Sequence, residues 1–161
     1  MTNRERYTDL RNGITELFGR IASDLGEARQ FADCKPLGDK LARLQKNYAP
    51  AIADMQKQNQ GNPLVIDRLI SDWSGAQALS VMPELVDDTD PDIESDVSGI
   101  LISAEAVLES LREGCAALEL LEVQNAALKE LYGFDDQACA MFSKLDTAEE
   151  VLEIYQETLD L

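Results

Sequence analysis

Residues 97–132 read VSGILISAEAVLESLREGCAALELLEVQNAALKELY, and this stretch decides the fold. Mainly apolar residues recur in it at alternating spacings of three and four, as in an amphipathic α-helix, and they form one face that we call the seam. Gly133 follows, and glycine is typical just beyond a helix end. The sequence therefore predicts one long helix over about 92–132, with Gly114 as the one position where it could break. The seam consists of Val97, Ile100, Ala104, Val107, Leu111, Gly114, Leu118, Leu121, Asn125, Leu128 and Tyr132.

Helices are also predicted before this stretch. Thr2 and Glu5 have the spacing of a capping box, which predicts a first helix that ends near Pro36. A second helix should begin at Pro36 and be kinked or divided at Pro50, because proline removes a backbone hydrogen bond. Asn62 and Pro63 follow the preferred order at a helix start, and they predict a short helix over 63–72.

After the long helix, two shorter ones are predicted over about 135–144 and 147–160. Asp146 and Glu149 have the capping-box spacing for the start of the second. Few Gly and Pro residues (9 and 5) and only 6% aromatic residues also favour helices. We therefore predict a single domain over 1–161, an all-α, antiparallel helical bundle of five to seven helices with one long central helix.

The residue types exclude many kinds of site. The chain contains no histidine, which excludes Ser-His and Cys-His catalysis and most zinc sites. Cys34, Cys115 and Cys139 are too widely spaced for a metal cluster or a disulfide framework, so we assign them structural roles. The alternating acids from Asp88 resemble a calcium loop only in part, because its sixth and twelfth positions are Ile93 and Gly99. We expect no enzyme activity, no cofactor and no metal.

The chain shows no segment typical of membrane insertion or secretion. No apolar run approaches the ~18 residues that a membrane span needs. The charged N-terminal residues MTNRER also lack the order of a signal peptide. We therefore expect a cytoplasmic protein.

Charge is distributed very unevenly along the chain. The net charge is -17. Residues 1–68 are near neutral, with nine acids and eleven bases, whereas residues 69–161 hold twenty-two acids and three bases. This asymmetry predicts a basic protein partner. It disfavours direct binding of nucleic acid or of anionic membranes, both of which would repel the chain.

The acids gather in three places. The stretch PELVDDTDPDIESD (83–96) holds seven, of which four suit a helix start, whereas Glu84, Asp87 and Asp88 do not. On the long helix and on the last helix, acids recur every four residues on faces predicted to be exposed, and such like-charge pairs each cost about 0.2–0.5 kcal/mol. The predicted partner-binding acids are Glu84, Asp87, Asp88, Glu105, Glu109, Glu113, Glu149, Glu153 and Glu157. The alternative is that these faces only keep the protein soluble.

Trp73 lies between two helical segments and close to the acidic stretch. One interpretation is that its ring covers the core of the bundle, because tryptophan is usually well buried. The other is that Trp73 is a partner-binding residue, an apolar anchor beside the acids.

Three functions fit this pattern. The first is an inhibitor of the anti-defence (anti-CRISPR) or immunity type, which covers a basic surface of its target and could mimic nucleic acid. The second is a secretion or assembly chaperone, which should leave an exposed apolar patch for an amphipathic client segment. The third is a structural coiled-coil subunit that forms a homodimer through the 97–132 seam.

Overall fold

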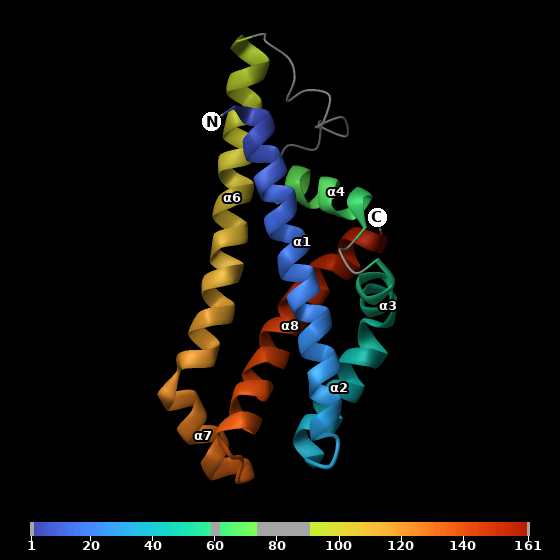
Figure 1. Cartoon of the computed structure of the whole chain (residues 1–161), viewed down its shortest axis with the longest axis vertical. Coiled ribbons are helices and arrows are strands. Elements are labelled where there is room, and N and C mark those ends of the chain that lie inside the picture. The colour runs from blue at the N-terminus through green and yellow to red at the C-terminus, as the bar shows by residue number, and fades with distance from the viewer. Residues whose placement is uncertain (1, 59–61, 74–90, 161) are drawn as a thin grey trace.

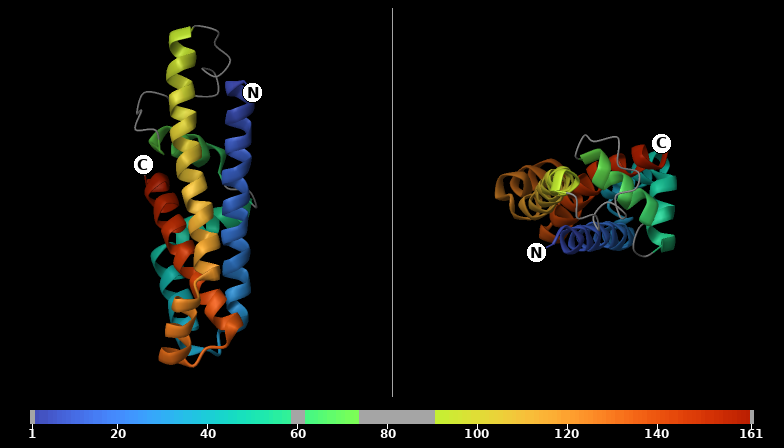
Figure 2. Two further views of the ribbon diagram at one scale, coloured as in Figure 1. Left: turned by 90° about the vertical axis from the view of Figure 1, so that its left-hand side faces the viewer. Right: turned by 90° about the horizontal axis from the view of Figure 1, so that it is seen from above.

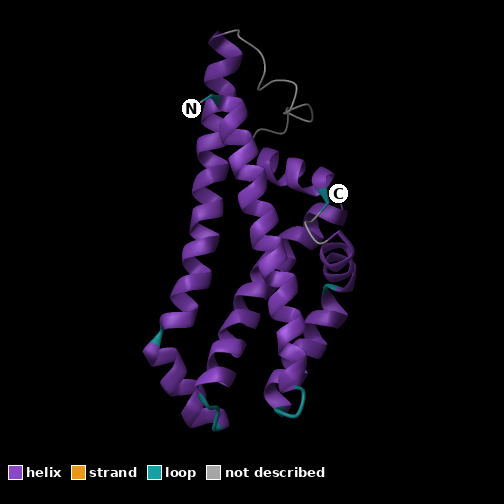
Figure 3. Cartoon of the chain, in the orientation of Figure 1, coloured by secondary structure: helices purple, strands orange, loops and turns teal. Residues whose placement is uncertain are grey.

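The computed structural model describes residues 2–58, 62–73 and 91–160, with the backbone alone at 58, 91–96 and 117–120. Every regular element in these ranges is helical (Figure 3). They comprise α1 (Asn3–Ala28), α2 (Lys35–Asn47), α3 (Ala49–Gln58), α4 (Pro63–Trp73), α6 (Pro91–Leu120), α7 (Glu122–Tyr132) and α8 (Asp136–Asp160), together with a 3₁₀ turn at Arg29–Phe31. The all-α prediction is confirmed.

Three long helices form the body of the bundle. The helices α1, α6 and α8 all contact one another. In Figure 1, α1 and α6 run in the same direction, whereas α8 returns antiparallel to both. Figure 2 shows the elongated outline that results. The helix α2 contacts the middle of α8, and α3 contacts its C-terminal part. The bundle is therefore antiparallel at two of its three central contacts and parallel at the third.

One apolar core connects the helices. It includes Leu10, Ile14 and Ile21 of α1, Leu101 of α6 and Leu152 of α8, all 3% exposed or less. Residues from α2, α3, α4 and α7 belong to the same cluster. Burial of this apolar surface is the main term that favours the bundle.

The predicted helix starts at Thr2, Pro50 and Asn62 are confirmed. The Thr2 hydroxyl accepts a hydrogen bond from the Glu5 backbone N–H at 3.2 Å, and Glu5 accepts one from the Thr2 backbone N–H at 2.8 Å. The helix α3 starts just before Pro50, so α2 and α3 are separate as predicted. The Asn62 side chain caps α4 by accepting from Leu64 N–H at 3.0 Å.

Two predicted boundaries are wrong. The long helix breaks at Leu121, whose φ of -74° and ψ of 98° are extended, and it continues through Gly114. The last two helices are one helix, α8, because Ser143, Leu145, Thr147 and Ala148 carry the buried face straight through the expected gap. Asp146 is therefore no N-cap. Gly133 ends α7 with φ 70°, as predicted.

Candidate acidic binding surface

The three glutamates predicted on α6 differ in their surroundings. Arg6 of α1 binds Glu105 with both ends of its guanidinium group, with Nε–Oε1 at 3.1 Å and Nη2–Oε2 at 3.2 Å. Glu109 lies 3.9 Å from Arg112 on the same helix. Only Glu113 is exposed without a basic neighbour in the described part of the chain. The expectation that all three simply face solvent is wrong for Glu105, because α1 packs against that side of α6.

Bases of α2 neutralise one edge of α8. Lys40 is 7% exposed and donates to Asp146, and its Nζ lies 3.8 Å from Glu149. Arg43 approaches Glu149 at 3.6 Å. The Lys40 ammonium also lies 4.7 Å from the centre of the Phe142 ring, a cation–π contact. Glu149 is therefore half-buried and paired, contrary to its predicted exposed position, because α2 covers it.

The adjacent face of α8 remains acidic. Glu150, Glu153 and Glu157 are exposed. The structure places no basic side chain within ion-pair distance of these three among the residues it describes. Burial raises the pKa of the nearby Tyr48 phenol, and the charges of Glu153 and Glu149 raise it further. We call Glu150, Glu153 and Glu157 the α8 acidic face.

Of the remaining predicted site residues, the structure describes only Trp73. The Trp73 ring is half-buried at the end of α4 and packs against the core, which agrees with its predicted role as a cover. Glu84, Asp87 and Asp88 lie outside the described residues.

Several residues of the predicted dimerisation seam are buried within the bundle of this one chain. Val97, Ile100, Ala104 and Leu128 are buried, whereas Leu121 and Tyr132 are 45% and 43% exposed. Among the described seam residues, Leu121 and Tyr132 at the ends of α7 are therefore the exposed ones, and Val107 and Leu111 are half-buried.

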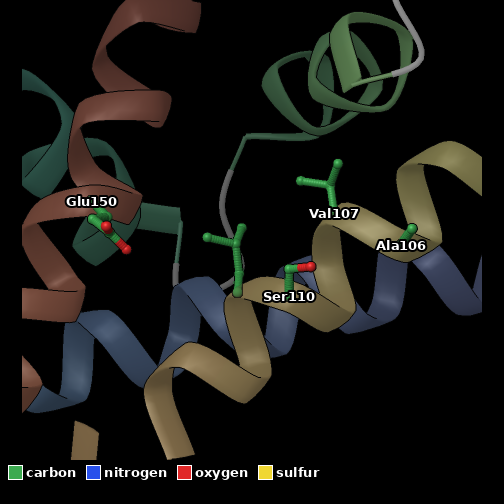
Figure 4. A pocket seen from close by; sticks show the side chains of 5 residues that line it. Ala106, Val107, Ser110 and Glu150 are labelled. Atoms are coloured by element: carbon green, nitrogen blue, oxygen red, sulfur yellow. The ribbon is translucent and has the colours of Figure 1, made fainter. Parts of the chain in front are cut away.

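A groove of about 380 Å³ lies between α6 and α8. Figure 4 shows Ala106, Val107 and Ser110 on α6, with Glu150 of α8 across from them. Leu111 completes the lining. The seam spacing did not predict this groove, because Val107 and Leu111 share that spacing with the buried residues Ala104 and Leu128. The available signal was the pair of small residues, Ala106 and Ser110, beside that seam.

The described residues contain no group of three or more Cys, Asp or Glu side chains placed to hold a metal ion. Cys115 and Cys139 are buried and Cys34 is half-buried, and none of them forms a disulfide. Of the described helices, none is long and apolar enough to cross a membrane.

Comparisons with protein-family models, with curated proteins and with solved structures gave no significant match.

Proposed function

We propose that this chain is a non-enzymatic binding protein that covers a basic surface of a partner protein with the α8 acidic face. One observation carries the proposal. Three bases of the near-neutral first part, Arg6, Lys40 and Arg43, pair with Glu105, Asp146 and Glu149. Among the described residues, no ion pair forms at the exposed Glu150, Glu153 and Glu157.

The arrangement of these acids has a cost for the folded chain. Like charges three and four residues apart on a helix destabilise it by about 0.2–0.5 kcal/mol per pair. A lysine in place of one of them would remove that cost. A basic partner removes it as well, because each carboxylate then gains an opposite charge.

We further propose that the protein acts as an inhibitor of the anti-defence or immunity type. Carboxylates along one helix face, with Cβ atoms about 5–6 Å apart, form a row of negative charge. Such a row competes with a nucleic-acid strand for a basic groove, since both are attracted by the same Lys and Arg side chains. Steering by the net charge of -17 would speed the encounter.

A chaperone is the second candidate, and α7 favours it. Val123 and Leu131 of this helix are 82% and 70% exposed, and Leu121 and Tyr132 lie at its two ends. A chaperone needs exposed apolar residues that form a contiguous patch for apolar segments of other proteins.

The test is affinity capture from the native cell with three baits, followed by mass spectrometry. The baits are the wild type, the α8 variant E150K/E153K/E157K and the control D9K/E16K/D39K, which makes the same charge change at exposed positions of α1 and α2. We expect a basic protein with the wild type and the control and its loss with the α8 variant. Recovery of the same protein by the α8 variant, or of partners without a basic surface, would contradict the proposal.

A further inference from the structure

The groove between α6 and α8 has an apolar floor and acidic surroundings. Val107 and Leu111 are half-buried on its α6 side, and the small exposed residues Ala106 and Ser110 leave space above them. Ile102, one turn before Ala106, is 55% exposed and extends the apolar surface along α6. The volume of the groove, about 380 Å³, lies in the range of roughly 300–1,000 Å³ typical of binding pockets.

The bases of the two helices are turned away from this groove. The described helices α6 and α8 contain one base each, Arg112 and Lys144. The Arg112 guanidinium group packs over Gly13 of α1. Lys144 points to Asp24 and Glu27, also on α1. The groove itself is bordered by Glu150, with Glu113 exposed on the α6 side.

We infer that this groove binds an amphipathic helical segment of the partner, whose apolar side chains contact Val107 and Leu111 while its Lys and Arg side chains reach the acids on both sides. This inference rests on the proposed function and specifies the part of the partner that is recognised. Helices that enter grooves present apolar residues at spacings of three and four. The charge of the borders selects basic flanks on such a helix.

The same charges argue against other occupants. A second copy of this chain that docked through its own α6 or α8 would bring like charges against Glu113 and Glu150. A nucleic-acid strand would be repelled, and its charged backbone has no apolar side chains for the floor of the groove. A basic amphipathic helix offers apolar side chains to the floor of the groove and positive charges to its acidic borders.

The inference can be tested with two labelled peptides of about 18 residues, long enough for roughly five helical turns. Both contain the same numbers of Leu and Lys. In one, Leu recurs at helical spacings of three and four, and in the other the order is scrambled. Fluorescence anisotropy gives the dissociation constant of each. We expect the amphipathic peptide to bind about tenfold more tightly, as loss of a buried anchor would cost.

Variants then locate the site. Ala106→Trp and Ser110→Trp fill the groove from exposed positions and should remove the preference, leaving the affinity for the scrambled peptide unchanged. Ala116→Trp, at an exposed alanine of the same helix, should preserve it. Equal binding of the two peptides, or a preference that survives Ala106→Trp or disappears with Leu131→Ser on α7, would overturn the inference.

If the proposed function itself is wrong, the peptide experiment should give a different result. In that case neither peptide would bind, or binding of both would be insensitive to salt and to E150K/E153K/E157K. If both peptides bind equally and lose affinity with this triple variant, the acidic face is functional and only the groove is excluded.

Discussion

Arg6 on α1 forms a two-pronged ion pair with Glu105 on α6, and its Nη1 also donates to the Ser98 hydroxyl at 3.0 Å. This contact joins two parallel helices that are far apart in the sequence. The contact also distinguishes Glu105, which has a basic partner, from Glu113, although the two residues have equivalent positions in the helical repeat.

Glu105→Lys and Glu113→Lys should therefore differ in stability. The first removes the pair and places two cations together, which should lower the free energy of unfolding by about 1 kcal/mol for this partly exposed pair. The second should change it by less than about 0.5 kcal/mol, as is usual for surface positions. Urea denaturation of both variants measures the difference. Equal destabilisation would show that the Arg6 contact contributes nothing.

Lys40→Ala should destabilise the contact between α2 and α8. The substitution leaves Asp146 without its base and removes the cation–π contact with Phe142. The two carboxylates are 33% exposed, so water compensates in part, and we expect a loss of about 1–3 kcal/mol. Lys46→Ala, an exposed lysine of the same helix, is the control and should be near neutral. Thermal unfolding of the two variants would settle this, and identical melting temperatures would contradict it.

Several of these contacts could not be predicted from the sequence. Helix type and most starts follow from local spacing, as at Thr2, Pro50 and Asn62. Asp146 and Glu149 also have a valid capping pattern, but a local pattern does not reveal that α2 will place Lys40 beside them. At Asp146 and Glu149, contacts between helices and not the local capping pattern determined the structure.

The break at Leu121 had no local signal either. The apolar spacing runs on from Leu118 through Leu121 to Leu128, and the break contains neither glycine nor proline. Gly114, the expected break, continues the helix because neighbouring residues supply enough packing to offset its cost of about 1 kcal/mol. The neutralisation of individual acids on α6 and α8 likewise depends on the helices that pack beside them, and local sequence does not reveal these neighbours.

Tyr155 should make stability fall at alkaline pH. Its side chain is fully buried, and its hydroxyl donates to Asp54 and accepts from Asn62 N–H at 3.2 Å. Burial, followed by the Asp54 hydrogen bond, raises its pKa above the ordinary value of 10.0. The unfolded chain then loses this proton first, so the contribution is complete below about pH 10 and is lost as pH rises above it.

Tyr155→Phe should lower the free energy of unfolding by about 1 kcal/mol near neutral pH, because Asp54 and the Asn62 N–H lose a partner. The variant should also lose less stability than the wild type between neutral and alkaline pH. Urea denaturation near pH 7 and near pH 11 measures both effects. A variant with the same pH dependence as the wild type would refute the assignment. Tyr132→Phe, at an exposed ring, controls for the loss of a hydroxyl near neutral pH.

Gly13 allows α1 and α6 to approach closely. A side chain there would meet Leu108 and Arg112 of α6, whereas one at Gly26 of the same helix would meet nothing within 4 Å. Gly13→Leu should destabilise by about 1–3 kcal/mol through overpacking, and Gly26→Ala should stabilise by up to about 1 kcal/mol. Chemical denaturation of the pair tests this. A Gly13→Leu variant as stable as the wild type would contradict the close approach.

The central claim is that the α8 acidic face steers binding to a basic partner. The most direct measurement is the association rate constant with the captured partner, by stopped flow at low and at high salt, for the wild type, E150K/E153K/E157K and D9K/E16K/D39K. Circular dichroism first confirms that all three are helical. We predict that the wild-type rate falls about tenfold or more as salt screens the charges, that the α8 variant is slow at both salt concentrations, and that the control resembles the wild type. Equal rates for the three proteins, with no effect of salt on the wild type, would contradict the claim and leave the acids as a solubilising surface.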